Sequence, residues 1–441
     1  MFAREELSDD ERYRRQGETE RSFRLRTDAD LDPLMDRIGD AHYVLLGEAS
    51  HGTHEYYTWR ARITKRLIRE KGFSFIAVEG DWPDCFHINR YVKGDKRGGD
   101  KITDVLRNFT RWPTWMWANW EIASLAEWLR KYNDQQAPGR KVGFYGLDVY
   151  SLWESMGTLL EFLQQEDPET AQLARQAVHC FEPYGEDEQR YAQATRSLSE
   201  SCKREVTTLL REIRKKAPSY DHDLEAPLNA EVNASVAVNA ERYYESMFSF
   251  GSKSWNIRDT HMTETLHRIM QFHGPDAKCV VWEHNTHIGD ARFTDMERDG
   301  MVNVGQLVRQ GHNQQDVVLV GFGSYQGTVI AGNGWGAPMQ VMPVPPARNG
   351  SVEALLHEEG AEDKLLLFDF YNEHERFRRA LGHRAIGVVY HPERERYGNY
   401  VPTVLSRRYD AFLYLDQTRA LHPMHLTPNG HLVPEGYPFG V

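Results

Sequence analysis

The sequence predicts an α/β protein whose core is a mostly parallel sheet with flanking helices. Three observations support this prediction. Short apolar runs alternate with longer amphipathic segments, several of these runs end in ionisable residues, and 441 residues that are 40% hydrophobic can bury a large core. Strands that alternate with helices typically form βαβ units and a parallel sheet. We also expect a large helical insertion and a smaller C-terminal α+β part.

The first 149 residues are expected to contain an N-terminal arm and the first part of the core. Residues 1–28 are so polar that we expect a flexible arm or a wrapped strand. Residues 29–149 then hold apolar runs of strand length, and the segment 54–71 has the spacing of an amphipathic helix. The strands expected here are residues 43–46, 75–78 and 141–145.

The rest of the chain is expected to contain the insertion and the second part of the core. Strand-like runs are missing from residues 150–273, where long charged segments rich in Ala, Leu and Glu predict helices. Residues 274–441 return to short strands with C-terminal α+β elements. The strands expected here are residues 279–282, 317–320, 365–369, 385–390 and 411–415. Residues 332–350, rich in Pro and Gly, are expected to form a long loop, and such loops often border functional sites.

The composition excludes several kinds of partner. Lys and Arg number 53 and Asp and Glu number 65, so the net charge is −12. Nucleic acids and anionic membranes are bound by clustered cations, so we expect neither as a partner. The four cysteines form no Cys-x-x-Cys pair, which argues against a disulfide framework or a thiolate zinc site. The N-terminus is charged where a signal peptide would be apolar. We expect a cytoplasmic protein, and the sequence does not indicate its oligomeric state.

Ionisable residues follow the expected strands at their carboxyl ends. In open parallel sheets, ligands bind outside this edge. Carboxylates buried there need cationic or imidazole partners, and Arg60 on the following helix is one candidate. The sequence therefore predicts a functional site at this edge of the sheet. The strand-end residues are Glu48, Glu79, Asp81, Asp148, Glu283 and His284.

The densest polar segment is residues 47–55, directly after the first strand. His51 belongs to the residue type whose pKa of about 6.5 suits proton abstraction at neutral pH, and Glu48 is placed to orient it. Ser50 and Thr53 are more simply explained as helix caps. A nucleophilic Ser50 has little support, because the Gly-x-Ser-x-Gly motif lacks its first glycine.

A second histidine pair, His284 and His287, follows the expected strand 279–282. These side chains could supply metal ligands, a second acid or base, or donors to an oxyanion. Together with His51 and His54 they indicate a shared site. Five tryptophans lie between residues 112 and 128. Their helical spacing favours core packing, with an apolar wall of a ligand pocket as the alternative.

Six segments resemble the erythromycin esterase family over nearly the whole chain. They are LLGEASHGTHE at 45–55, VEGDWPD at 78–84, GFYGLDVYSL at 143–152, SWNIRDTHM at 254–262, VVWEHNTHIGD at 280–290 and YGNYVPTV at 397–404. The resemblance implies an α/β core with a helical subdomain. It also implies hydrolysis of the lactone ester of macrolide antibiotics by water, with no cofactor and no metal, and hence a role in antibiotic resistance.

The resemblance also implies the roles of individual residues. His51 would be the general base, Glu48 and Glu79 would support it, and His284 and His287 would complete the cleft. The same resemblance implies roles in the cleft for Arg60, Asp148 and Arg258. His54 and Asp81 are expected to bind substrate with them, because both lie in the polar segments that follow the expected strands.

The resulting prediction is an esterase in which His51 activates water without a covalent intermediate. Carboxylates around the histidines favour a neutral or cationic ester or lactone as the small-molecule substrate. Two alternatives stay open. One is a metal-dependent hydrolase that uses the His51, His54, Glu79, His284 and His287 side chains as ligands. The other is a non-catalytic protein that binds a small apolar molecule in an aromatic cleft.

Overall fold

A central sheet organises the fold in the computed structural model, which describes residues 21–184, 190–194, 201–220, 223–247, 251–368, 377 and 379–425. The described residues form one mixed sheet of nine strands. Eight follow in the order β1 (Arg21–Arg24), β8 (Lys364–Leu367), β11 (Ala411–Thr418), β6 (Val317–Gly332), β2 (Tyr43–Leu46), β5 (Cys279–Trp282), β3 (Phe75–Asp81) and β4 (Gly143–Asp148), and β7 (Met339–Val344) pairs with β6. All five pairings from β11 across to β4 are parallel. The α/β class and the mostly parallel sheet are therefore confirmed.

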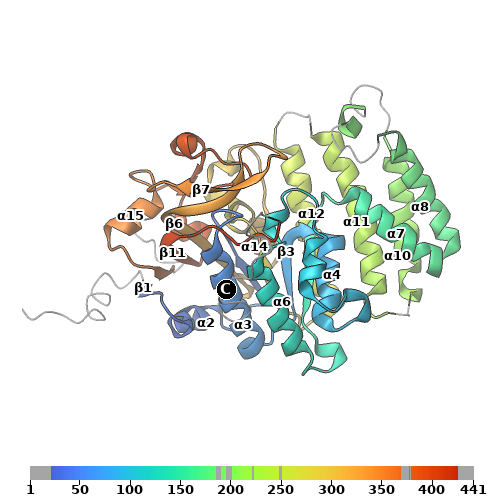
Figure 1. Cartoon of the computed structure of the whole chain (residues 1–441), viewed down its shortest axis with the longest axis horizontal. Helices are drawn as coiled ribbons and strands as arrows, with labels where there is room; N and C mark the ends of the chain where they lie inside the picture. Colours follow the sequence, from blue (N-terminus) through green and yellow to red (C-terminus); the bar gives the residue numbers. More distant parts are fainter. Residues whose placement is uncertain are drawn as a thin grey trace, which may run out of the picture.

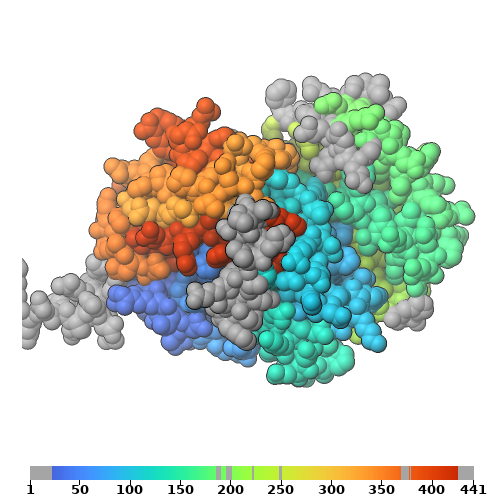
Figure 2. Space-filling view, in the orientation of Figure 1, coloured from blue at the N-terminus to red at the C-terminus, as the bar shows by residue number. Residues whose placement is uncertain are grey.

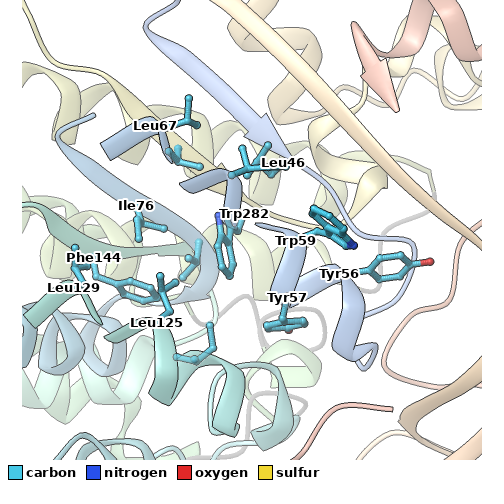
Figure 3. Close-up of a cluster of buried hydrophobic side chains, with 14 of the residues drawn as sticks. Leu46, Tyr56, Tyr57, Trp59, Leu67, Ile76, Leu125, Leu129, Phe144 and Trp282 are labelled. Atoms are coloured by element: carbon cyan, nitrogen blue, oxygen red, sulfur yellow. The ribbon is translucent and has the colours of Figure 1, made fainter. Parts of the chain in front are cut away.

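Helices cover both faces of this sheet, because its strands are apolar on both sides. Along β2, Val44 and Leu46 pack in one apolar cluster, and Tyr43 and Leu45 pack in another on the opposite face. The first cluster is closed by α3 (His54–Lys71), α4 (Trp82–Lys93) and α6 (Trp120–Asn133). Figure 3 shows part of it, with Trp282 of β5 among side chains from α3 and α6. The second is closed by α12 (Lys253–His273) and α14 (Val304–Gly311).

Helix α3 has the bounds that the sequence predicts. Buried side chains recur every three or four residues along it, which gives the helix one continuous inner stripe. Gly72 ends the helix in the left-handed conformation, with φ of 69°, where a residue without Cβ is favoured. The helix follows β2 directly, so its first turn lies at the carboxyl edge of the sheet.

All regular secondary structure described in residues 152–273 is helical, and the described residues between the helices form short connections. Figure 1 shows α7 (Leu152–Glu166), α8 (Pro168–Phe181), α10 (Lys203–Lys216) and α11 (Ala226–Ser246) gathered on one side of the sheet, with α12 between them and the strands. These helices share their own apolar cluster, built largely from Ala, Leu and Val. No helix in the described residues is long and apolar enough to cross a membrane.

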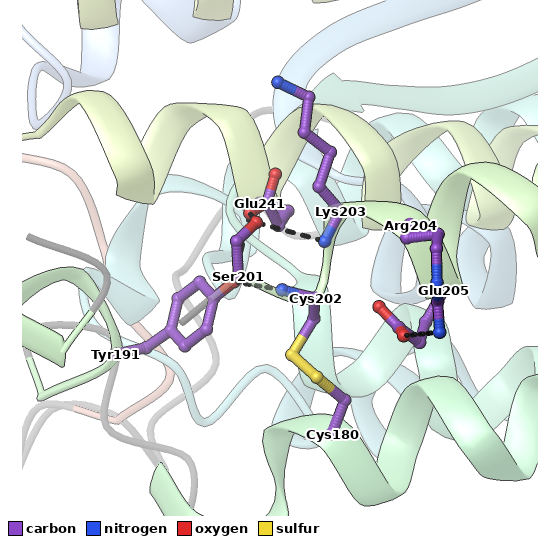
Figure 4. The surroundings of a disulfide bond; sticks show 8 residues. All are labelled: Cys180, Tyr191, Ser201, Cys202, Lys203, Arg204, Glu205 and Glu241. Atoms are coloured by element: carbon purple, nitrogen blue, oxygen red, sulfur yellow. Dashed lines mark hydrogen bonds and ion pairs between the residues drawn. A yellow bond between two sulfur atoms is a disulfide. The ribbon is translucent and has the colours of Figure 1, made fainter. Parts of the chain in front are cut away.

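The prediction that the cysteines are unpaired is wrong for two of the four. Cys180 at the end of α8 and Cys202 before α10 form a disulfide, shown in Figure 4. They are 22 residues apart in sequence, but the packing of α8 against α10 brings their Cα atoms to 5.9 Å. Cys85 and Cys279 are buried thiols. Cysteine usage therefore no longer supports a reducing compartment.

Two predictions about the second half of the core need correction. Residues 332–350 do not form one continuous loop, because Met339–Val344 form strand β7. Its proline is compatible with a strand because β7 lies at the edge, paired only with β6. The strand expected at 385–390 lies earlier, at β9 (Leu381–Arg384), which pairs with β10 (Tyr400–Thr403) in a small second sheet. Residues 385–390 instead make single bridges to other segments, including Ile386 to Ser50.

The expected N-terminal arm lies only partly within the described residues. Residues 1–20 lie outside them, whereas β1 pairs antiparallel with β8 at the edge of the sheet. Within the segment 1–28, which is expected to form an arm or a wrapped strand, residues 21–24 therefore form a paired strand.

Candidate active site

A cavity of about 160 Å³ lies at the carboxyl ends of β3 and β4, at the edge where the sequence predicts a site. One part of its wall is polar and ionisable, and the other is aromatic. The polar part comprises His51, Glu79, Asp81, Asp84, Arg111, Asp148 and Arg258. The apolar part comprises Phe109, Trp112, Pro113, Met116, Trp117, Tyr150, Trp335 and Val388.

His51 is held by a chain of buried charges. Its Nδ1 lies 2.9 Å from Oε1 of Glu48, and Oε2 of Glu48 accepts a hydrogen bond from Nη2 of Arg60 at 2.6 Å. Arg60 has no exposed surface and lies over the rings of Tyr57 and Trp282, at 4.4 and 4.6 Å from their centroids. With Nδ1–H donating to Glu48, the lone pair of Nε2 is the one left for chemistry in the cavity.

The loop that carries His51 is fixed by backbone contacts with distant segments. The carbonyl of Gly52 accepts hydrogen bonds from the amides of Ile330 and Leu421, both at 3.0 Å. A Cβ on Gly52 would lie 2.0 Å from the carbonyl oxygen of Ile330, so this close approach requires glycine. The amide of Ile386 donates to the carbonyl of Ala49 at 2.8 Å. His51 is therefore positioned by residues from the second half of the chain.

Arg258 on α12 joins two strand-end carboxylates on the cavity wall. Its Nε and Nη2 donate to the two oxygens of Asp148 at 2.9 and 2.7 Å, and Nη2 also donates to Glu79 at 2.7 Å. Burial alone would raise the pKa of Glu79, but His287, Arg258 and His51 together hold it well below its usual range. Glu79 is therefore ionised, and the amide of His284 donates to its second oxygen at 2.8 Å.

His287 lies behind the cavity between two carboxylates. Its Nδ1 is 2.9 Å from Asp259 and its Nε2 is 3.4 Å from Glu79. Burial would lower the pKa of His287, but Asp259 and Glu79 raise it to about 10. Nη1 of Arg258 also lies 3.1 Å from Nε2 of His287. The two carboxylates favour the protonated form of His287, which makes it a poor proton acceptor at neutral pH.

We predict that His287 stays protonated throughout the neutral pH range. Its folded-state pKa lies above the ordinary value of 6.5, so its charge stabilises the fold fully below about pH 6.5, and this contribution is lost as the pH rises through about 10. NMR of ¹⁵N-labelled imidazoles should show an imidazolium for this ring at pH 8, with a His287→Gln variant to assign it. A neutral ring at pH 8 would contradict the prediction.

His284 differs from His287 because it is neutral. Its Nδ1 accepts from the Thr286 amide at 3.3 Å and lies 2.8 Å from the Thr286 hydroxyl, which places the ring hydrogen on Nε2. Burial and the neighbouring His51 lower its pKa well below 6.5, with the backbone of Ala49 among the smaller opposing influences. Its ring centroid lies 5.0 Å from that of His51. Among the residues that the structure describes, the buried Nε2 has no hydrogen-bond partner of normal geometry, which leaves one N–H donor beside the His51 ring.

The structure separates two of the predicted substrate-binding residues from the cavity. Arg60 lies behind Glu48, and His54 at the start of α3 turns away to bond Glu121 of α6 at 2.6 Å. Neither residue lines the cavity, so neither is placed to contact a substrate bound there. Helix periodicity explains the difference, because α3 directs both side chains toward its buried stripe. Asp148, Asp81 and Arg258 do line the cavity.

The structure does not bring together the five side chains that the metal-dependent alternative would use as ligands. Among the described residues, the group of three His, Cys, Asp or Glu side chains whose ligand atoms converge is His54, Glu121 and His422. His54 is therefore in a different cluster from His51. The hydroxyl of Ser50 bonds that of Thr53 rather than His51, so the arrangement gives a Ser50 nucleophile no base.

The tryptophans serve both of the purposes considered from the sequence. Trp115 and Trp120 are core residues, whereas Trp117 packs in the core and also lines the cavity. Trp112 lies at the rim, where its indole N–H donates to the carbonyl of Ala337 at 2.9 Å and its ring lies 4.7 Å from that of Trp335. In Figure 2, cyan segments of the first half of the chain adjoin orange segments of the second half.

Sequence reasoning assigned no role to three residues that shape the site, although Glu283 was already grouped with the strand-end residues. Asp259 was not distinguished from its neighbour Arg258 although both lie in SWNIRDTHM. Glu283 is fully buried with both carboxyl oxygens unpartnered among the described residues, and burial raises its pKa well above 4.5, so it is neutral. Arg111 faces the cavity and pairs with Asp81 at 3.1 Å. Their burial and partners depend on tertiary packing, which no local pattern signals.

Comparisons with known proteins identify the family of this chain and show which solved structures share its fold. The family model for erythromycin esterases matches residues 68–418. Erythromycin esterase type II of Escherichia coli is 22% identical over 377 residues, which cover 77% of this chain and 83% of that protein. A succinoglycan biosynthesis protein has a similar structure, with a TM-score of 0.73 and 20% identity, covering 91% of this chain and 95% of that one. A mutant erythromycin esterase in its open conformation has a TM-score of 0.66 and 17% identity, covering 94% and 100%.

Proposed function

Because this chain belongs to the erythromycin esterase family, a family of esterase-type hydrolases, we propose that it cleaves a carboxylic ester or macrolactone with water activated by His51. The observation that carries the proposal is the buried Arg60–Glu48–His51 chain, which ends in an imidazole facing the cavity. The family match begins at residue 68, after His51. The role of His51 therefore depends on its geometry and on the resemblance at residues 45–55.

In the proposed reaction, His51 removes a proton from water while the oxygen attacks the ester carbonyl. Glu48 is an anion 2.9 Å from Nδ1 and stabilises the imidazolium that forms. The tetrahedral intermediate then collapses, and His51 returns the proton to the leaving alcohol. Arg60 acts through Glu48: without its hydrogen bond, the carboxylate could rotate away from the ring. No bond between substrate and protein forms in this scheme.

The developing oxyanion needs a donor close to the attacked carbonyl. His284 lies beside His51 rather than on the cavity wall, and it is the donor we propose because, among the described residues, its Nε2–H has no acceptor of normal geometry. A buried donor without a partner costs free energy, and a transient negative charge would satisfy it. Arg60 and His287 are less suited, since Arg60 is held by Glu48 and His287 by Asp259 and Glu79.

The cavity wall favours a neutral or cationic substrate with a bulky apolar part. Four carboxyl groups line it against two arginines, and both arginines already pair with carboxylates. Burial and the neighbouring Asp81 raise the pKa of Asp84 to about 7, so only part of its charge is present at neutral pH. Aromatic rings at the rim provide a surface against which the apolar part of a macrolide can pack. We therefore propose macrolide lactones as the first substrates to test.

The test is a product screen by mass spectrometry against macrolides, simple esters and acyl amides. Hydrolysis of a macrolactone adds the mass of one water to the compound, and hydrolysis of an acyclic ester or amide gives an acid and an alcohol or amine whose summed mass exceeds that of the compound by one water. Sequestration by a binding protein leaves the mass of the compound unchanged. We expect the added water with at least one ester or lactone, and no acyl adduct on the intact protein during turnover. A tightly bound compound of unchanged mass across the panel would favour the binding protein, and an acyl adduct on the protein would overturn the non-covalent scheme.

A further inference from the structure

His54, Glu121 and His422 converge from three distant parts of the chain. The Nδ1 atoms of the two histidines lie 2.6 and 2.7 Å from the same oxygen, Oε1 of Glu121. One possible ligand atom from each side chain lies within 4.8 Å of the others. His54 and Glu121 are buried, while the His422 side chain is 44% exposed. The cluster is therefore anchored on one side and open to solvent on the other.

The backbones that carry these side chains are tied together independently of the cluster. The amide of His54 donates to the carbonyl of Arg419 at 2.8 Å, and the amide of Trp120 donates to the carbonyl of His422 at 3.1 Å. The amide of Met424 donates to the carbonyl of Ala118 at 2.9 Å. These bonds fix the starts of α3 and α6 and the segment 419–424 relative to one another, so the three side chains are brought together before any ligand binds.

We propose that His54, Glu121 and His422 form a binding site for a divalent transition metal ion, Zn²⁺ in particular, separate from the His51 cavity. Two imidazole nitrogens and one carboxylate oxygen form a donor set that zinc accepts, with a fourth position left for water. The ion would replace the two ring hydrogens that now point at Glu121. The exposed side of His422 gives the ion and the water a route in.

The cluster needs only a small adjustment to hold the ion. Zinc lies about 2.0–2.1 Å from each ligand in a tetrahedron, so its ligand atoms are about 3.3 Å apart. The present nitrogen–oxygen distances are 2.6 and 2.7 Å, so the side chains must open by less than about 1 Å. His422 can supply most of this movement because it is the exposed member. The bound ion would join the start of α3, three residues after His51, to α6 and to the segment 419–424.

The test uses the full chain, stripped with a chelator and then titrated with Zn²⁺ or Co²⁺. We expect one equivalent to bind per chain, the visible absorption of four-coordinate Co²⁺, and a rise in Tm with zinc. Even loss of a group that only orients a ligand costs about 10–100-fold in metal affinity, so His422→Gln is expected to weaken binding by more than this. The matched control is His357→Gln, which removes a histidine 2.6 Å from Asp416 without touching the cluster.

Each outcome decides the proposal. Loss of the Co²⁺ absorption and of the zinc-induced Tm rise in His422→Gln, with both kept in His357→Gln, would support it. The rise in Tm is measured for each protein as the difference between its Tm with and without zinc, so a lower starting Tm in the variant does not affect the comparison. Equal zinc binding by His422→Gln and the unmodified chain, or no binding by the unmodified chain, would overturn the site. Because none of these readouts uses turnover, the result is independent of the esterase proposal.

Discussion

Replacing His51 by Ala is expected to lower kcat by about 10²–10⁴-fold, the usual contribution of a positioned general base. The imidazole lines the cavity and contacts Glu48 through Nδ1, so its removal deletes the proton acceptor for water. The effect on folding should be small, since truncation of this ring enlarges an existing cavity rather than opening a new void in the core. The measurement is kcat and KM with the best ester from the product screen, together with Tm.

The matched control is His179→Ala. His179 also pairs with a glutamate three residues away, Glu182, at 2.7 Å, but its side chain is 82% exposed on α8. We expect this variant to keep the kcat of the unmodified protein. If His51→Ala retains full turnover, His51 is not the base and the proposed reaction is wrong.

Replacing Arg258 by Met is expected to destabilise the fold by about 3–5 kcal/mol, the usual effect of removing one partner from a buried ion pair. The side chain is 12% exposed and neutralises Glu79 and Asp148, which are themselves almost fully buried. Without the guanidinium, the pKa of Glu79 should rise, because burial then opposes its charge with less compensation. Urea denaturation at neutral pH measures the loss.

The defect of the Arg258→Met variant should shrink as the pH falls. In the unmodified protein the pKa of Glu79 is depressed, so its charge stabilises the fold above the unfolded-state pKa, and this contribution disappears in acid. The variant loses much of that contribution at neutral pH and regains stability as Glu79 is protonated. The control is Arg268→Met on the same helix, whose arginine is 33% exposed and pairs with Glu231, with an expected loss below about 1 kcal/mol. Equal losses at both positions would contradict the buried-pair argument.

The sequence predicted best the elements whose signals are local. The bounds of β2, β5 and α3 agree with the prediction, because each combines a clear apolar period with a polar or glycine boundary. Strand β7 and the register of β9 depend on pairing with residues far along the chain, and no local pattern contains that information. The disulfide was missed for the same reason, since helix packing rather than spacing brings Cys180 to Cys202.

The site was predictable in part from one topological rule. Carboxyl ends of parallel strands share an edge, and this rule correctly grouped Glu79, Asp81 and Asp148 with His51 around one cavity. The rule could not tell which side chains turn away from that edge, as His54 does toward Glu121. It also could not give the opposite pKa shifts of His284 and His287: burial and the neighbouring His51 lower the first, whereas Asp259 and Glu79 raise the second against burial.

The backbone hydrogen bonds from segment 419–424 to the His51 loop also limit when, during its synthesis, the protein can first become active. The loop is made early, yet Gly52 bonds Leu421, and His54 bonds Arg419. Strand β11 likewise lies between β8 and β6 although it is the last strand of the sheet to be made. While these residues are still inside the ribosome, the nascent chain has an open sheet and a His51 loop without these backbone contacts. Activity should therefore arise only after nearly the whole chain has emerged, rather than domain by domain.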